Sequence, residues 1–501
     1  MYHLRNIFLM LLFFSFNVNL FAQDTLMFIS EPINLGATVN SMYSEAEPKI
    51  SPDGKYLYFC RRANPENVGS GDIWVAQKLE NGEWQQAQNP GKPLNDEKWN
   101  QVVAVHSDGN KLLINGRYLE HAESHLYIAQ RTATGWANPK NISFKDFIED
   151  GTSYGATTDF KVIIIAAHWE GGIGDDDLYI SFQINDTLWS KPKNLGKTIN
   201  TIGSEVYPTL APDGKTLYFS STGFDGLGDY DLFMTKRLDD TWLNWSTPEN
   251  MGELINTVNY DADFTTDAQA NYAYISCNKN LGMNFDIFKV QLPQEKKPTQ
   301  MVVIMGIITD KETGAPLETT INYYDMATWN LLGTISSSAS SGEYSLVLDM
   351  DKAYAIEVEK TGYHRDERNF DFRNITEYKQ AIQNFELAKV DKNLPDGIVV
   401  YFDVGSAVPK NFDVMNRLVN YLKSNDKTVT IKGHTDDVGN ENSNWQLSMD
   451  RAKAIENFLL SNGIDGWRIE IHAEGESIPF ASNNTEAGRA ENRRVTIYVN
   501  D

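Results

Sequence analysis

One sequence unit recurs five times between residues 28 and 293. Each copy contains a turn with an aspartate, then an apolar strand, then a strand that in four copies begins Asp-Leu or Asp-Ile before an aromatic residue. Because a unit of a few short strands cannot bury its own apolar face, the copies must stack on one another. The turn aspartates are spaced 51 to 55 residues apart and are Asp53, Asp108, Asp159, Asp213 and Asp267.

Each copy holds about four short strands separated by Asp-Gly turns, which predicts the blade of a β-propeller. The fifth copy stops after Phe288, and Ile33-Asn34-Leu35-Gly36 matches its missing last strand, so we expect the N-terminal segment to complete the last blade. The repeats resemble TolB-like propellers built from PD40 repeats, which include six-bladed members, whereas five copies are present here. We expect the strand aromatics to pack between blades: Trp74, Tyr127, Tyr179, Phe233 and Phe288.

Residues 302–388 follow a charged, proline-containing joint at 293–298 and again predict short strands. The order is Val302 to Ile308, a turn at 313–317, then Thr320 to Tyr324, 342–346 and 354–358. This order of glycines, prolines and aromatics resembles the carboxypeptidase regulatory-like β-sandwich. The resemblance implies a non-catalytic domain.

The pattern changes after a second joint at 389–397, and residues 396–501 predict an α+β domain. Apolar positions three and four residues apart predict a helix from about Phe412 to Leu422 and another at about 442–461, with Gly463 as a C-terminal cap. Alternation predicts four strands, at 398–402, 428–432, 469–472 and 495–499.

The spaced motifs of this last domain resemble the C-terminal domain of the OmpA family. Two segments are looser matches: Ala473-Glu474-Gly475-Glu476 and the opening Phe402 to Ser406. The motifs that match are Gly433-His434-Thr435-Asp436-Asp437-Val438-Gly439, Asn444, Leu447-Ser448, Arg451-Ala452, Gly463-Ile464, Gly475-Glu476, Pro479, Asn483, Gly488-Arg489 and Asn492-Arg493-Arg494-Val495.

The resemblance implies that Asp436 and Arg451 hold the diaminopimelate of the peptidoglycan stem peptide. The chemistry agrees, because a side chain that ends in an ammonium and a carboxylate needs one anion and one cation, and arginine can engage a carboxylate with two hydrogen bonds. The start of the nearby helix would add backbone N–H donors. The resemblance also implies supporting roles for Thr435, Asn444, Leu447 and Arg493.

Composition and the first residues restrict the location and the partners. A basic Arg5, an apolar run from Ile7 to Phe16 and Ala22 predict a secretory signal peptide over residues 1–22. No later segment is long and apolar enough for a transmembrane helix. The net charge of −24 argues against nucleic acid as a partner. We therefore expect an exported, periplasmic protein associated with the cell wall and outer membrane.

Other candidate sites carry weaker signals. Gly151-Thr152-Ser153-Tyr154-Gly155 fits a nucleophile motif but lies inside a blade repeat, where the strand and helix that such a motif needs are not expected. The acidic loops at 175–177 and 225–231 could bind calcium but lack EF-hand spacing, so turns are favoured. Cys60 and Cys277 are expected to face opposite sides of their strands, which argues against a disulfide. We predict no metal site and no cofactor.

The sequence thus predicts a non-enzymatic, multidomain envelope protein with a propeller of about five blades, a sandwich and an OmpA-like domain. The last domain would bind peptidoglycan, and the propeller would recruit a protein or, as second choice, a glycan. Two alternatives stay open. The chain could anchor an outer-membrane secretion complex in the periplasm, or the propeller could be the active domain of an envelope enzyme, for which the sequence shows no convergent set of residues in the channel.

Overall fold

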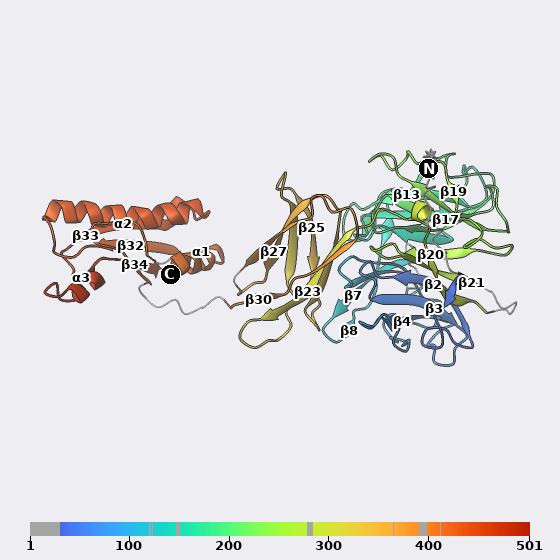
Figure 1. The fold of residues 1–501 in the computed structure, drawn as a ribbon, viewed down its shortest axis with the longest axis horizontal. Coiled ribbons are helices and arrows are strands. Elements are labelled where there is room, and N and C mark those ends of the chain that lie inside the picture. Colours follow the sequence, from blue (N-terminus) through green and yellow to red (C-terminus); the bar gives the residue numbers. More distant parts are fainter. Residues whose placement is uncertain are drawn as a thin grey trace, which may run out of the picture.

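A computed structural model describes residues 31–119, 122, 124–146, 151–277, 284–363, 365–389, 398–410 and 412–500 (Figure 1). The expected signal peptide at 1–22 lies outside these residues. The described chain is mostly β-structure, with its longer helices confined to the C-terminal part. Among the described residues, no helix is both long and apolar enough to cross a membrane.

Five larger antiparallel sheets, one for each sequence repeat, and one two-stranded parallel sheet are formed by residues 33–291, and we call them together the five-sheet assembly. The first sheet comprises β2 (Ser44–Ile50), β3 (Tyr56–Arg62) and β4 (Gly71–Gln77). The second comprises β5 (Gln101–Val105), β6 (Lys111–Asn115), β7 (Leu126–Thr132), β8 (Gly135–Trp136) and β9 (Lys140–Asn141).

The other three sheets repeat this order. The third comprises β11 (Ser153–Ala156), β12 (Val162–Ala167), β13 (Asp177–Phe182) and β15 (Lys193–Asn194), while β10 (Ser143–Phe144) pairs with β14 (Leu188–Trp189). The fourth comprises β16 (Glu205–Leu210), β17 (Thr216–Ser221), β18 (Asp231–Lys236) and β19 (Glu249–Asn250). The fifth comprises β20 (Ala262–Thr266), β21 (Tyr272–Cys277), β22 (Asp286–Gln291) and β1 (Ile33–Asn34).

The first strands of the five sheets contact one another in sequence order. Strand β2 contacts β5, β5 contacts β11, β11 contacts β16, β16 contacts β20, and β20 contacts β2 again. Burial of apolar area between successive sheets stabilises this order. The five strand aromatics are all buried, as the sequence predicts: Trp74, Tyr127, Tyr179, Phe233 and Phe288.

The N-terminal segment pairs with the last repeat, which confirms the sequence expectation for residues 33 and 34. Ile33 lies opposite Lys289 and Asn34 opposite Phe288. The buried Asn40 side chain donates to the Ile287 carbonyl at 2.9 Å and accepts from the Ile287 amide at 2.8 Å. Equivalent asparagines bridge their own sheets: Asn95 to Ile73, Asn200 to Leu178 and Asn256 to Leu232.

Residues 302–387 form two four-stranded sheets that share one hydrophobic core. Strands β25, β28 and β29, whose side chains are mostly exposed, and the three-residue strand β30 are not predicted by the sequence pattern. One sheet contains β23 (Val302–Asp310), β26 (Glu343–Leu348), β29 (Lys379–Ile382) and β30 (Phe385–Leu387). The other contains β24 (Thr320–Asp325), β25 (Leu331–Ser336), β27 (Ala353–Glu359) and β28 (Asp366–Asp371).

These two sheets contact the end of the five-sheet assembly where the aspartate turns lie. Met301, Val303 and Met305 pack against Ala268, and the Met301 amide donates to the Ala268 carbonyl at 3.1 Å. Asn110 Nδ2 donates to the Ser336 carbonyl at 2.8 Å. The short connection between the two regions contains a 3-10 turn, η1 (Gln294–Lys296). The aspartate-turn end is therefore covered.

The C-terminal part is an α+β layer whose sheet has the order β31-β34-β32-β33. Helix α2 packs on β32 and β33. Four of the five apolar residues predicted for one face of α1 are buried, from Met415 to Leu422, whereas Phe412 at its start is 49% exposed. Gly463 has the left-handed φ of +83° expected of a cap. The elements are β31 (Ile398–Tyr401), α1 (Phe412–Lys423), β32 (Thr428–His434), α2 (Glu441–Ser461), η2 (Gly466–Arg468), β33 (Ile469–Gly475), α3 (Glu486–Asn492) and β34 (Arg494–Asn500).

The Asn40 bridge predicts a stability effect. Asn40→Ala leaves the buried N–H of Ile287 without its partner, which costs about 1–3 kcal/mol, and its C=O keeps only the Leu35 amide at 3.2 Å. We expect the free energy of unfolding of the five-sheet assembly to fall by about 2 kcal/mol or more, measured by urea unfolding with tryptophan fluorescence. Asn259→Ala, at an exposed loop position, serves as the control. Equal midpoints for both variants would contradict the role of Asn40.

Candidate functional site

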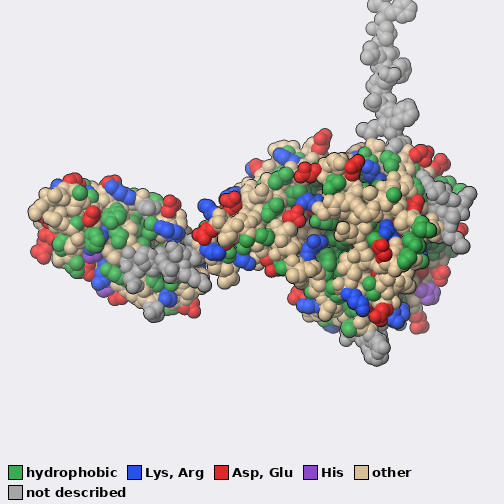
Figure 2. Space-filling view, turned by 90° about the horizontal axis from the view of Figure 1, so that it is seen from below, with side chains coloured by type: hydrophobic (Ala, Val, Ile, Leu, Met, Phe, Trp, Pro, Cys, Tyr) green, Lys and Arg blue, Asp and Glu red, His purple; other side chains and the backbone are tan. Residues whose placement is uncertain are grey.

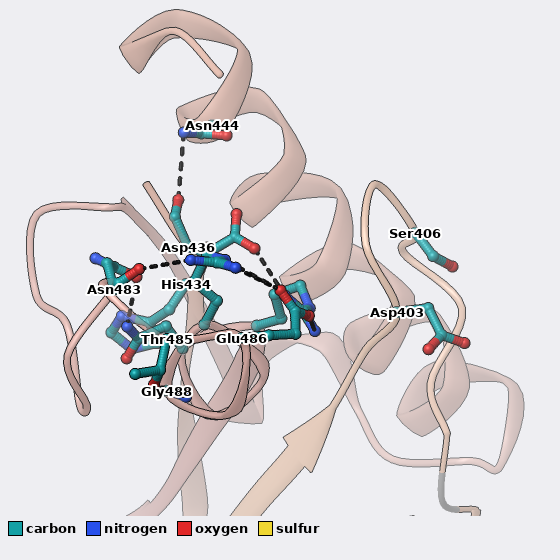
Figure 3. Close-up of polar contacts among 12 residues, drawn as sticks. Asp403, Ser406, His434, Asp436, Asn444, Asn483, Thr485, Glu486 and Gly488 are labelled. Carbon is teal, nitrogen blue, oxygen red and sulfur yellow. Dashed lines mark hydrogen bonds and ion pairs between the residues drawn. The ribbon is translucent and has the colours of Figure 1, made fainter. Parts of the chain in front are cut away.

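Asp436 lies in the turn that follows β32 and precedes α2. Asp436 is 6% exposed, and the preceding Thr435 is 2% exposed. The Asp436 carbonyl accepts a hydrogen bond from Asn444 Nδ2 at 3.3 Å, so the first turns of α2 hold this loop (Figure 3). Asn440 caps α2 by accepting from the Ser443 amide at 2.9 Å.

The Asp436 carboxylate forms an ion pair with Arg493, which the sequence pattern ranks only as a supporting residue. Arg493 Nη1 lies 2.9 Å from Asp436 Oδ2, and Arg493 Nη2 lies 2.8 Å from Glu486 Oε1. Burial disfavours the charged guanidinium, but the hydrogen bonds that it donates to the two carboxylates outweigh this effect and raise the pKa of Arg493. Figure 3 shows Asp436 and Glu486 directed toward the same group.

Arg451 is fully buried and is held by backbone carbonyls. Its Nε donates to Ser406 at 2.8 Å, its Nη1 to His434 at 2.8 Å and its Nη2 to Asp403 at 3.0 Å. Burial lowers the pKa of Arg451 to about 10, and Arg493 adds to this while Asp436 opposes it. The loop at 403–406 therefore covers the guanidinium, and a ligand can reach Arg451 only if this loop moves.

Three buried polar atoms around Asp436 have no hydrogen-bond partner among the described residues. They are Thr435 Oγ1, His434 Nδ1 and Arg493 Nε. A buried polar atom without a partner is destabilising by about 1–3 kcal/mol, and such groups call for an explanation. Their position beside a buried carboxylate indicates a place where polar groups of a ligand can complete the hydrogen bonding.

The structure thus brings Asp436, Thr435, Arg493 and Asn444 together, with Arg451 beneath them. Leu447 is half-buried on α2. Glu486 is the residue that the sequence pattern misses. The feature that could have pointed to Glu486 is the start of α3, where Thr485 Oγ1 accepts a hydrogen bond from the Gly488 amide at 3.1 Å and so fixes the first turn beside Arg493.

The weaker candidates of the sequence have structural roles. Ser153 lies on β11, and its Oγ accepts from the Tyr207 amide at 2.8 Å. In the acidic loops, Asp177 and Asp231 accept backbone N–H bonds that shape the turns. Groups of three or more side chains suited to a metal ion are absent from the described residues. Cys60 and Cys277 are both buried, and Cys60 is a free thiol.

The structure corrects one sequence expectation, because titratable side chains do converge where the first strands meet. The Glu47 amide donates to Asp263 Oδ2 at 3.1 Å, and Lys49 Nζ donates to Thr209 Oγ1 at 3.0 Å. Burial, reinforced by Asp263, raises the pKa of Glu47 to about 8, and burial lowers that of Lys49. The sequence misses this cluster because it depends on strand irregularities, with φ of +58° at Glu47 and +61° at Asp263.

The cavity beside this cluster is small. Lys49, Thr209 and Thr265 are among the residues that line a space of about 40 Å³. A water molecule needs roughly 10–15 Å³ of such space, so the cavity accommodates a few water molecules at most.

Comparison with known proteins identifies the C-terminal part. Residues 401–493 match the OmpA family, so this part of the chain is an OmpA family domain. "Peptidoglycan-binding protein ArfA" of Mycobacterium tuberculosis is 42% identical over 99 residues, which are 20% of this chain and 30% of the relative. Outer membrane protein A of Bordetella avium is 36% identical over 99 residues, 20% of this chain and 51% of the relative. The chain therefore spans a third to a half of these relatives.

Two solved structures are also similar to this region. The peptidoglycan-associated lipoprotein from Burkholderia pseudomallei is 26% identical, and the match covers 22% of this chain and 98% of that one with a TM-score of 0.21. The cell wall anchor of the T6SS from Pseudomonas aeruginosa is 28% identical, and the match covers 21% and 81% with a TM-score of 0.19.

The buried His434 predicts a pH effect on stability. Burial, together with Arg494 and Lys432, lowers its pKa from 6.5 to about 4. Between these values the unfolded chain binds a proton that the folded domain does not, so the stability present above pH 6.5 is lost as the pH falls toward 4. In urea unfolding at a series of pH values, the free energy of unfolding of His434→Gln should fall less between pH 6.5 and 4 than that of the natural protein.

The exposed His472 provides the matched control for this prediction. His472→Gln should keep the pH dependence of the natural protein, since its side chain is about half in solvent. If His434→Gln and His472→Gln have the same pH dependence as the natural protein, the assignment to His434 is wrong.

Proposed function

We propose that this protein is a non-enzymatic component of the cell envelope that binds peptidoglycan containing diaminopimelate through Asp436 and Arg451. The observation that carries the proposal is the buried Asp436 carboxylate beside the partnerless Thr435 Oγ1 and Arg493 Nε. A ligand that offers both an ammonium and a carboxylate fits such mixed surroundings, whereas a purely cationic or anionic ligand would meet one unfavourable partner.

The relatives support the ligand class. The mycobacterial relative is named a peptidoglycan-binding protein, and the B. avium relative is an outer membrane protein. The family match covers every proposed ligand contact from Thr435 to Arg493. The match covers about a fifth of the chain. It therefore supports the anchoring of the protein and does not bear on the function of the remaining residues.

Each proposed contact has a distinct chemical role. Asp436 would accept hydrogen bonds from the ammonium of diaminopimelate, and Arg451 would donate to its carboxylate after the 403–406 loop moves aside. Thr435 would use its free Oγ1 as a donor or acceptor. Asn444 and Leu447 would line the site from α2, and Arg493 would hold the Asp436 carboxylate in place at 2.9 Å.

For the rest of the chain, we propose a five-bladed propeller at 28–293 and a carboxypeptidase regulatory-like sandwich at 302–388, joined to the OmpA-like domain at 396–501. The support is five consecutive sheets whose first strands contact one another in order, with β1 completing the fifth sheet. The protein would be exported to the periplasm and held at the cell wall close to the outer membrane. The first two regions would then be available for a protein or glycan partner.

Removal of either charged residue tests the site. Asp436→Ala and Arg451→Ala should abolish pelleting of the full chain with diaminopimelate-type peptidoglycan, because loss of one member of a buried charged contact costs about 2–5 kcal/mol, or roughly 30-fold or more in affinity. Asp437→Ala is the matched control, since this neighbouring carboxylate is exposed. Bound and free fractions are measured by sedimentation and gel densitometry.

Folding must be separated from binding in this test. Asp436→Asn keeps the size of the side chain and a hydrogen-bond acceptor for Arg493, so it should retain the thermal transition of the natural protein and still lose the ammonium contact. Unchanged pelleting of Asp436→Asn, Asp436→Ala and Arg451→Ala would refute the assignment of these residues.

A further inference from the structure

The end of the five-sheet assembly opposite the aspartate turns carries exposed apolar side chains at repeated positions. Three of them occupy the loop before the first strand of a sheet: Met42 is 79% exposed, Ile202 is 90% exposed and Val258 is 78% exposed. Leu227 at 46% and Val68 at 37% lie in the loops between the second and third strands. We call these five residues the apolar tips.

Buried carboxylates fix the loops that carry the first three tips. The Thr201 amide donates to Glu205 Oε2 at 2.8 Å, and the Ser41 amide donates to Glu45 Oε2 at 3.1 Å. The Thr257 amide donates to Asp261 in the same way. Since Glu45, Glu205 and Asp261 are all buried, the exposure of Met42, Ile202 and Val258 belongs to an ordered, repeated structure.

Neighbouring sheets bring the two kinds of loop together. The Asp175 amide donates to the Gly203 carbonyl at 2.9 Å, and the Asp261 amide donates to the Tyr230 carbonyl at 3.0 Å. A Cβ at Gly228 would lie 2.3 Å from the Asn259 carbonyl oxygen, so only glycine allows this close approach. Leu227 and Val258 therefore sit on backbone segments that touch, and the tips continue from one sheet to the next.

The same loops carry a surplus of acidic side chains. In the space-filling view, hydrophobic, acidic and basic side chains lie beside one another on the visible face of the assembly (Figure 2). Lys98, Arg117 and Lys197 are the exposed Lys and Arg residues among the described positions 36–43, 64–70, 96–99, 116–119, 168–176, 196–204, 222–230 and 252–260. The exposed carboxylates there are those of Glu66, Glu97, Glu170, Asp175, Asp225, Asp229 and Glu253.

We infer that this end of the assembly is a docking surface for a protein segment in which basic residues alternate with apolar ones. Exposed apolar groups framed by polar residues mark interaction sites, and a potential of one sign attracts a partner of the opposite sign. A second copy of this chain would bring the same carboxylates face to face, and an anionic lipid surface would be repelled. The other end is already covered by residues 301–305.

This inference is independent of the peptidoglycan site, because it uses no residue of the C-terminal part. Its test uses the full chain with Asp436 and Arg451 intact, so that either proposal can fail alone. The probe is a fluorescent synthetic peptide of about 16 residues in which lysine and leucine alternate. Two companion peptides replace all lysines by glutamate or all leucines by serine.

Two double variants probe the surface, and binding is followed by fluorescence anisotropy. Ile202→Ser/Val258→Ser should lower the affinity for the lysine-leucine peptide about ten-fold, because this variant loses apolar contact area. Asp175→Lys/Asp229→Lys should also lower this affinity about ten-fold, and the affinity of this variant should depend less on salt concentration. Neither companion peptide should bind as tightly to the natural protein.

The matched control is Ile184→Ser/Leu238→Ser. These residues are 52% and 60% exposed but lie beyond the opposite ends of β13 and β18. The control should bind the peptide like the natural protein, and circular dichroism should show that all variants fold. Equal weakening by the control, unchanged binding by both tested variants, or equal binding of the glutamate-leucine peptide would overturn the inference.

Discussion

The arrangement of the first three hundred residues depends on one bridge between distant parts of the chain. Asn40 bonds both backbone groups of Ile287 in a buried position, and β1 adds to the edge of β22. In the first, third and fourth sheets the equivalent asparagine follows the strand that it bridges, whereas Asn40 bridges the N-terminal segment to the last repeat. The Leu35 amide and β1 also pair with β22. Without β1, the fifth sheet would expose an open edge to solvent.

In the C-terminal part, buried charge is balanced in two different ways. Arg451 is neutralised mainly by the dipoles of three carbonyls, whereas Arg493 is paired with Asp436 and Glu486. Removing one partner of such a group is costly, while the intact arrangement contributes little net stability. Two buried cations beside one buried carboxylate are the feature on which we base the proposed ligand site.

Much of this arrangement follows from the sequence, and the exceptions have physical reasons. The strand at Ile33 is predicted because its segment matches the last strand of the other repeats, and the helix that begins at Phe412 because its apolar spacing is local. The Asp436–Arg493 pair is not, because it joins residues that only the sheet order β34-β32 brings together. Strand β28 escapes prediction because it lies at a sheet edge and is held by backbone pairing to β27, while most of its side chains are exposed.

Calorimetric titration of the full chain with a soluble stem peptide that ends in diaminopimelate tests the proposed site at Asp436 and Arg451 most directly. The comparison peptide carries lysine instead, which keeps the ammonium and removes one carboxylate. We predict that the diaminopimelate peptide binds and that the lysine peptide binds at least about ten-fold more weakly. The Asp436→Asn variant should bind neither peptide. Equal affinity for the two peptides, or full binding by Asp436→Asn, would contradict the proposed site.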